Sequence, residues 1–271
     1  MDAKYLFLLS LVTLMLGIQI YAYKDKLFGN QNNSNENESI DYSKETNIKR
    51  KSYFEDFTNE FSPSDTFKLY YFKVNGRAAI ARAILSYANV KFENILIESD
   101  QWKKMKPEPL FEFGQVPILV HNKKTLSQSK AIFLYLARLF NLYGKTLDDK
   151  YQIDSLLNSH DDIAKFYYPY IYPQTEDEKK NPKVYKEKFE TEFKRILLIY
   201  QKRYMNFGIK KYYLGDYFSL ADIYLTVEMN IFASTLGGVE YIIQNARVLG
   251  RYIQRIMKDE LKKYYATYFI K

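Results

Sequence analysis

From Thr66 onward, the pattern of apolar residues in this chain changes once, close to Gly144, and this change limits the fold more than any other feature. Before Gly144, short apolar and aromatic runs alternate with segments of helical spacing, whereas only helical spacing follows it. Strands are predicted at 67–72, at 92–97 and in a hairpin over 117–126, and helices at 76–87, 130–139, 148–168 and 183–205. Ser219, with Asp222 three residues later, is typical of the start of a further helix. The predicted fold class is therefore α/β with a mixed sheet, followed by all-α.

Two segments of different character precede this pattern. Residues 5–23 carry no charged side chain and are about as long as a helix that spans a bilayer. We expect residues 1–23 to be a signal anchor. The alternative is a signal peptide cleaved after Ala22, although Ile20 is larger than a good cleavage site prefers. Residues 24–65 are rich in Asn, Ser, Glu and Lys, which predicts a flexible tether.

The composition excludes several kinds of chemistry. The chain has no Cys, so a disulfide framework, a protein thiolate nucleophile and Cys-ligated metal centres are excluded. Its two His, His121 and His160, are too few for a multi-His metal centre, and we expect no metal. Any thiol chemistry must use a thiol that the ligand brings. The formal net charge is +8, but Lys and Arg are spread among acidic residues, so we expect no nucleic-acid partner.

Five short motifs connect the chain to a known family. They are Lys68-Leu69-Tyr70-Tyr71-Phe72, Gly76-Arg77-Ala78, Trp102 with Lys106, Phe113-Gly114-Gln115-Val116-Pro117 and Leu126-Ser127-Gln128-Ser129-Lys130-Ala131-Ile132. In these motifs and their order, residues 66–265 resemble the glutathione S-transferases, and the sigma-type class most closely. The resemblance implies a thioredoxin-like, glutathione-binding domain over 66–145 and an all-helical domain over 146–271. It also implies glutathione as the co-substrate.

The resemblance assigns glutathione binding to a set of residues whose chemistry suits an extended tripeptide. They are Trp102, Lys106, Gln115, Val116, Pro117, Gln128, Ser129 and Asp162. If the Val116-Pro117 bond is cis, it leaves an open position where an extended peptide can pair. The positive end of the helix at Gln128-Ser129 suits the γ-glutamyl carboxylate. The indole of Trp102 and the ammonium of Lys106 are donors for the glycyl carboxylate. The plainer alternatives are that Trp102 covers the core and that Ser129 only caps a helix.

The resemblance places the thiol-activating residue of the family at Tyr71, directly before Phe72. Alternation along a strand does not choose between Tyr70 and Tyr71, because they face opposite sides. A phenol that donates a hydrogen bond to the glutathione sulfur favours its thiolate. Arg77 would add positive potential near the sulfur, or would be a surface ion-pair partner. The family usually has Glu two residues after this Arg, where the chain has Ala79, so a partner that orients Arg77 is missing.

These residues predict an enzyme that conjugates the glutathione thiolate to small apolar electrophiles, with isomerase or peroxidase chemistry as variants. The alternative is a non-catalytic glutathione-transferase-like protein with a structural or ligand-carrying role. The joint presence of Tyr71, Val116-Pro117 and Gln128-Ser129 argues against that alternative. The electrophile would meet aromatic residues of the helical domain, for example Phe166, Tyr167 and Tyr170.

Two further expectations concern partners and location. Asp162 aligns with an acid that, in the family, reaches the amino group of glutathione across the dimer interface, which implies a homodimer with shared sites. Asn32 and Asn37 each begin an Asn-x-Ser triplet that a lumenal domain could carry glycosylated. We expect a membrane-anchored protein whose domain faces the cytosol, where reduced glutathione is abundant, and a secretory or lumenal domain is the alternative.

Overall fold

The computed structural model describes residues 61–270, and the predicted α/β unit forms its first part. Four strands form its sheet: β1 (Phe67–Phe72), β2 (Glu93–Ile97), β3 (Ile118–His121) and β4 (Lys124–Leu126). The spatial order is β2-β1-β3-β4, with β2 parallel to β1 and the two other pairs antiparallel. The mixed sheet predicted from the sequence is therefore confirmed.

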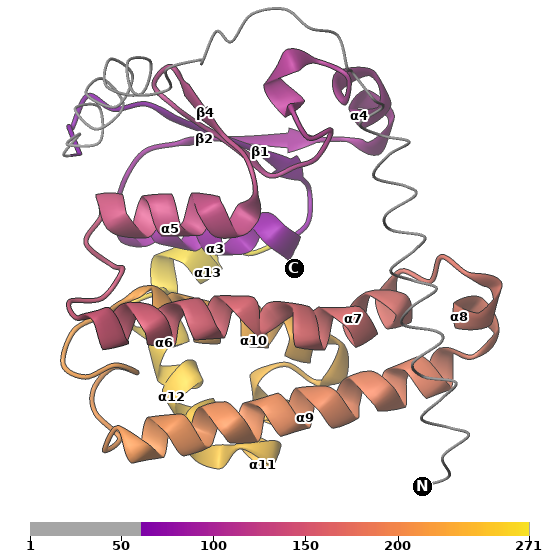
Figure 1. The fold of residues 1–271 in the computed structure, drawn as a ribbon, viewed down its shortest axis with the longest axis vertical. Helices are drawn as coiled ribbons and strands as arrows, with labels where there is room; N and C mark the ends of the chain where they lie inside the picture. The colour runs from indigo at the N-terminus through magenta and orange to yellow at the C-terminus, as the bar shows by residue number, and fades with distance from the viewer. Residues whose placement is uncertain (1–60, 271) are drawn as a thin grey trace, which may run out of the picture. The chain divides into compact units, whose positions relative to one another are not determined.

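Helical segments cover both faces of this sheet (Figure 1). The first face carries η2 (Gly76–Ala78), α3 (Ala79–Tyr87) and α5 (Ser129–Leu139), and the second carries α4 (Ser99–Met105) and η3 (Pro109–Phe111). Because side chains alternate along β1, Leu69 and Tyr71 join the large core on the first face. Tyr70 points to the second face, where its ring lies edge-on to Phe111 at 6.1 Å. Tyr70 and Tyr71, between which strand alternation alone cannot choose, thus lie on opposite faces of the sheet.

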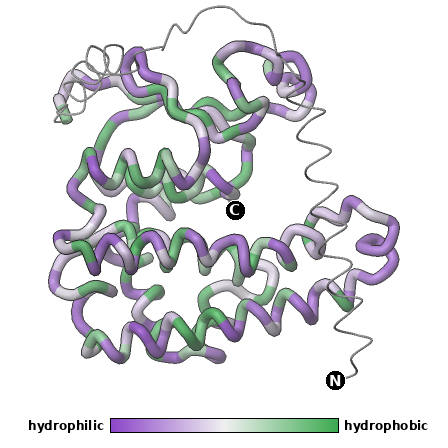
Figure 2. The backbone as a smooth tube through the Cα atoms, in the orientation of Figure 1, coloured by the Kyte–Doolittle hydropathy of each residue, from purple (hydrophilic) through white to green (hydrophobic). Residues whose placement is uncertain are grey.

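The remainder of the described chain is helical, as predicted. Its segments are α6 (Leu147–Asn158), α7 (His160–Ile171), α8 (Glu176–Lys180), α9 (Pro182–Asn206), α10 (Leu220–Ala233), η4 (Ser234–Leu236), α11 (Val239–Asn245), α12 (Arg247–Lys258) and α13 (Lys262–Thr267). Apolar and polar stretches alternate along α6, α7 and α9 (Figure 2), as expected of helices with one face on a core. In contrast, α10 is buried along nearly its whole length and packs against α3, α6 and α12.

The helix predicted over 148–168 is in fact two helices, α6 and α7, which meet at Ser159. The Ser159 hydroxyl donates to the carbonyl of Leu156 at 2.7 Å and pairs with the hydroxyl of Tyr200. The amide of Asp162 then donates to the Ser159 carbonyl at 3.2 Å, which is a tight i to i+3 turn. This local hydrogen bonding competes with a continuous helix, and it places His160 at the beginning of α7.

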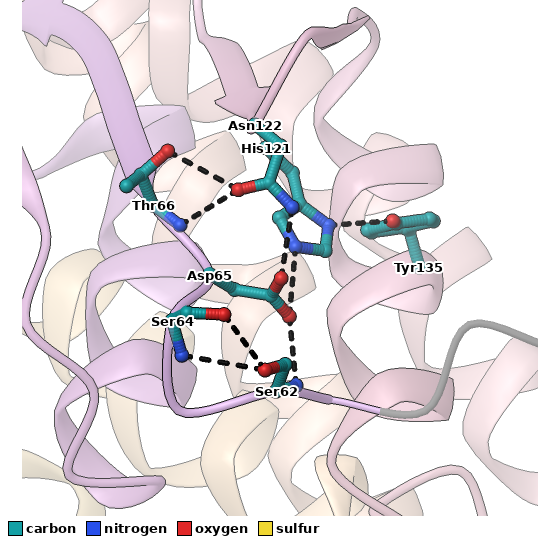
Figure 3. Close-up of polar contacts among 7 residues, drawn as sticks. All are labelled: Ser62, Ser64, Asp65, Thr66, His121, Asn122 and Tyr135. Atoms are coloured by element: carbon teal, nitrogen blue, oxygen red, sulfur yellow. Dashed lines mark hydrogen bonds and ion pairs between the residues drawn. The ribbon is translucent and has the colours of Figure 1, made fainter.

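A polar cluster ties the first described residues to the sheet (Figure 3). The Asp65 carboxylate accepts from the amide of Ser62 at 2.9 Å and from the side chain of Asn122 at 2.8 Å. It also lies 3.2 Å from Nε2 of His121, whose Nδ1 is 2.7 Å from the hydroxyl of Tyr135. The hydrogen bonds from Ser62 and Asn122 lower the pKa of Asp65. Residues 61–65, predicted as the end of the tether, are therefore held against the α/β unit.

The predicted anchor at 1–23, the two Asn-x-Ser triplets and most of the predicted tether lie outside the described residues. Within 61–270, no helix has the length and apolar character needed to cross a membrane.

Candidate active site

Tyr71 lies at the edge of the large core, next to the loop that follows β1. Its side chain is buried, and its hydroxyl oxygen accepts a hydrogen bond from the backbone N–H of Arg77 at 3.0 Å. Because the oxygen accepts this bond, the hydroxyl hydrogen is directed elsewhere and can be donated to a ligand. Gly76 comes so close that a Cβ at this position would stand 2.6 Å from the Tyr71 hydroxyl oxygen. The backbone at Gly76 has φ +38°, which also favours glycine.

Burial keeps Tyr71 in its neutral form. Burial raises the pKa of Tyr71, while the hydrogen bond from Arg77 and the positive charges of Arg77 and Arg82 act in the opposite direction. Arg82 is fully buried, and its guanidinium donates to the carbonyl of Val74 at 2.7 Å and to the side chain of Asn94 at 3.1 Å. With a raised pKa, the Tyr71 phenol retains its proton at neutral pH and acts as a donor.

Arg77 is oriented by an aromatic ring that we did not predict. Ala79, at the position where the resembling family has Glu, is fully buried on α3. The Arg77 guanidinium instead lies over the ring of Tyr168, 5.8 Å from its centroid. Burial raises the pKa of Tyr168 to about 12, which Arg77 partly opposes. Among the aromatic residues of α7, Tyr168 therefore faces the site, whereas Tyr167 packs against Phe232 at 4.9 Å in the core.

The predicted tripeptide-binding edge lies before β3 and at the start of α5. The bond between Val116 and Pro117 is cis, which meets the condition for an open pairing position at Val116. The pairing of β3 with β1 begins at Ile118, so Val116 lies outside this ladder. Gln128 is the N-cap of α5, with φ 67°, and Ser129 is the first residue of that helix. The backbone N–H groups of a first helical turn have no partner inside the helix, so this end favours an anion.

Trp102, in the middle of α4, and Lys106, the residue that caps its C-terminal end, are one helical turn apart. The ring of Trp102 is half-buried and meets Phe111 edge-on at 5.1 Å, so it also covers the smaller core on the second face of the sheet. The carbon chain of Lys106 lies beside Gly114, directly before the exposed Gln115. The structure therefore brings Trp102, Lys106 and Gln115 to one region.

Asp162 does not lie with Ser129. It is about half exposed, with 55 % of its side-chain surface accessible, and it lines a cleft of about 520 Å³ between α6, α7 and α9 that also contains Arg195 and Arg203. The acid that reaches the start of α5 within one chain is its neighbour Asp161, which is 2.8 Å from the ammonium of Lys130. The predicted contact of Asp162 with glutathione would thus come from a second chain.

A small cavity next to Ser129 is lined by residues of both the α/β unit and the helical part. Its volume is about 20 Å³, and its lining includes Arg77, Ser129, Lys130, His160 and Glu228. Nδ1 of His160 lies 2.6 Å from a carboxylate oxygen of Glu228. Sequence reasoning named His160 only as one of two His and missed Glu228 and Tyr168, since helical spacing cannot show which residues of α7 and α10 meet. Across 61–270, no group of three or more His, Asp or Glu is placed to hold a metal ion.

The described residues form a mixed α/β domain with a cis-proline edge, followed by helices that complete a site at the start of α5. This is the arrangement of thioredoxin-fold proteins with an added helical domain. Two family models match this chain: "Glutathione S-transferase, N-terminal domain" over residues 66–138 and "Glutathione S-transferase, C-terminal domain" over residues 161–260. The chain belongs to the glutathione S-transferase family. It is therefore an enzyme of a family that uses glutathione as its co-substrate.

Individual relatives agree with this assignment. The chain is 32 % identical over 159 residues to the hematopoietic prostaglandin D synthase of Mus musculus, which covers 58 % of this chain and 75 % of the relative. It is 32 % identical over 161 residues to glutathione S-transferase alpha-4 of Rattus norvegicus, and the match covers 58 % of this chain and 70 % of that relative. The structure of monomeric Na-GST-3, a glutathione S-transferase of Necator americanus, is similar with a TM-score of 0.63 and 26 % identity, covering 75 % of this chain and 97 % of that one.

Replacing Gly76 by Ala should slow turnover by about 10- to 100-fold, because the new methyl group would displace the Tyr71 hydroxyl by a fraction of an ångström or more. Gly208→Ala is the matched control. Gly208 also has a positive φ, +87°, but nothing lies within 4 Å of its Cβ position. Both variants should lose about 1 kcal/mol of folding free energy, measured by denaturant unfolding. Equal turnover in the two variants would show that Gly76 does not position Tyr71.

Proposed function

We propose that this enzyme conjugates the thiolate of glutathione to small apolar electrophiles, with Tyr71 as the donor to the sulfur. The observation that carries the proposal is the neutral, buried phenol of Tyr71, with its oxygen held by the N–H of Arg77 and its hydrogen left for a ligand. Arg77 adds positive potential beside it. Glutathione lies along the edge from Val116 to Ser129, with its γ-glutamyl carboxylate at the start of α5 and its glycyl carboxylate near Trp102 and Lys106.

An isomerase reaction that uses glutathione is a second candidate, because the relative from Mus musculus is named a prostaglandin D synthase. The resemblance to the sigma-type class points in the same direction. In both reactions, Tyr71 would act on the same sulfur, and only the electrophile would differ.

The experiment that tests the proposal is turnover of a generic aryl halide by the full chain with glutathione. We expect conjugate formation that depends on enzyme and glutathione. A chain that binds glutathione without turning over any electrophile would instead support the structural or ligand-carrying alternative.

We also propose a homodimer in which Asp162 of one chain completes the site of the other. Asp162 is exposed and separate from the Ser129 cavity of its own chain, which supports a contact in trans. Mixed dimers of a Tyr71→Phe chain and an Asp162→Ala chain should then contain one intact site of two. We expect about half of the wild-type activity, well above either parent variant. Activity that does not exceed the parent variants, or a monomer like the Necator americanus relative, would contradict shared sites.

Finally, we propose that residues 1–23 anchor the enzyme in a membrane with its domain on the cytosolic side. The uncharged segment 5–23 and the need for reduced glutathione support this placement. In sealed membrane vesicles with the cytosolic face outward, added protease should digest the domain, and glycosidase treatment should leave its mobility unchanged. A protected domain whose mobility shifts after deglycosylation at Asn32 or Asn37 would establish the lumenal alternative.

A further inference from the structure

The two histidines of the chain have very different surroundings. His121 lies in the cluster of Figure 3, with its Nδ1 2.7 Å from the Tyr135 hydroxyl and its Nε2 3.2 Å from a carboxylate oxygen of Asp65. His160 is 8 % exposed at the beginning of α7, and its Nδ1 lies 2.6 Å from a carboxylate oxygen of Glu228 on α10. Glu228 is itself only 6 % exposed. A buried pair of this kind is costly unless its remaining polar atoms also find partners.

One polar atom of this pair has no partner within the described residues. Nε2 of His160 is buried and makes no hydrogen bond to any group of 61–270. The imidazole lines the small cavity that Ser129, at the start of α5, also lines. A cavity of about 20 Å³ has room for one water, which needs polar partners on more than one side. Nε2 of His160 and the first turn of α5 supply such partners.

Charged groups of both signs line this cavity. Glu228 and Tyr224 line the cavity from α10, Arg77 lines it from η2, and Lys130 lines it from α5. On α7 itself, Asp161 pairs with Lys130 at 2.8 Å, and Tyr168 lies under Arg77. A ligand carboxylate at the start of α5 adds a negative charge that opposes the positive charges of Arg77 and Lys130, so its arrival favours a proton on the imidazole more than the ligand-free site does.

We propose that His160 is a positioning residue for the γ-glutamyl end of glutathione, and that it acts through one buried water on the carboxylate bound at the start of α5. This inference rests on the proposed function and adds a residue to its binding site. His160, held by Glu228, presents an Nε2–H to the water when it is protonated, and the water donates to the ligand carboxylate.

A direct consequence is that ligand binding and proton uptake are linked. If binding favours the protonated imidazole, affinity must increase as the pH falls through the range in which His side chains titrate. Attraction between two unit charges separated by one water predicts an increase in affinity of about 3- to 10-fold.

The test measures the dissociation constant of S-methylglutathione for the full chain between pH 5.5 and 7.5. This analogue has no ionisable thiol, so the thiolate chemistry of Tyr71 does not contribute, and the ligand carboxylates are ionised throughout this range. Trp102 is the only Trp of the chain, and its fluorescence reports binding near the glycyl end. We expect the wild type to bind about 3- to 10-fold more tightly at pH 5.5 than at pH 7.5.

His160→Gln should abolish this pH dependence, and His121→Gln, which removes the only other His, should preserve it. A pH-independent wild type, or a His160→Gln variant with the wild-type dependence, would overturn the inference. A wild type that binds no S-methylglutathione would contradict the proposed function, and with it this inference.

A second measurement does not require a folded His160 variant. The wild type has two His side-chain signals in nuclear magnetic resonance spectra, and His121→Gln assigns them. Saturation with S-methylglutathione should move the titration midpoint of the His160 signal upward by about 0.5 to 1 pH unit, which is the same linkage measured from the other side. The His121 signal should not move. An unchanged His160 midpoint would equally overturn the proposal.

Discussion

Tyr71→Phe should raise the pKa of the bound glutathione thiol by about two units, from about 6.5 back to the usual value of about 8.5, while glutathione affinity changes little. The variant keeps the buried ring and loses only the donor to the sulfur. A shift of two units corresponds to about 2.7 kcal/mol of thiolate stabilisation. The measurement is the ultraviolet absorbance of the thiolate as a function of pH, with binding measured in parallel.

The effect of Tyr71→Phe on rate should itself depend on pH. At pH 7.4 the wild type gains about tenfold in thiolate fraction, but a Brønsted slope of about 0.45 removes nearly as much in intrinsic reactivity. Below about pH 6 the thiolate fraction differs by nearly 100-fold, so turnover of the variant should fall by about tenfold or more. Close to pH 7.4 the net deficit from ionisation should therefore nearly disappear. Any difference in turnover that remains at this pH measures how much Tyr71 contributes by positioning the sulfur.

Tyr70→Phe is the control, since Tyr70 lies on the opposite face of β1 against Phe111. It should leave the thiol pKa and the pH profile unchanged. A shifted thiol pKa in the Tyr70 variant, together with an unchanged one in the Tyr71 variant, would reverse our assignment.

Asp222→Ala should have the largest effect on stability, about 3 to 5 kcal/mol. The Asp222 carboxylate is fully buried at the start of α10, where it accepts from the amide of Tyr213 at 2.8 Å and from the amide and hydroxyl of Ser219 at 2.6 and 2.8 Å. The hydroxyl of Tyr252 donates to it as well. Burial raises the pKa of this carboxyl, and these hydrogen bonds oppose the increase. Removing the carboxylate leaves several buried donors without acceptors.

Denaturant unfolding measures this loss, and Asp216→Ala is its matched control. The Asp216 side chain is 83 % exposed and has only a distant Lys210 partner at 4.0 Å, so its removal should not measurably change stability. If Asp222→Ala were no more destabilising than Asp216→Ala, the hydrogen bonds to Asp222 would not be what holds the start of α10 in place.

Sequence reasoning succeeded where local pattern decides the structure. β1 has the predicted bounds, because five apolar or aromatic residues in a run of six, interrupted only by Lys68, leave little choice of register. The start of α10 was also predictable, since Ser219 and Asp222 carry a capping pattern in four residues. The break at Ser159 was missed, although Ser159 to Asp162 repeats the same Ser-x-x-Asp spacing. The apolar periodicity of residues 148–168 continues through this break and hides it.

The parts of the site that could not be predicted are contacts between distant helices. His160 and Glu228 are far apart in the sequence, and each alone would be interpreted as an ordinary polar residue of a helix. Tyr168 differs from Tyr167 by only one position, and the rotation of α7 decides which of them meets Arg77. Helical periodicity gives an apolar face but not the neighbour against which it packs. The family resemblance, rather than periodicity, selected Tyr71 and Ser129.

The most direct test of the account is a spectroscopic titration of glutathione bound to the wild-type chain. If the Tyr71 phenol donates to the sulfur, the thiolate absorbance should develop with a midpoint about two pH units below that of free glutathione thiol, whose usual pKa is about 8.5. Bound glutathione with the same midpoint as free glutathione would contradict the central claim, because a buried neutral donor at Tyr71 would then have no effect on the thiol.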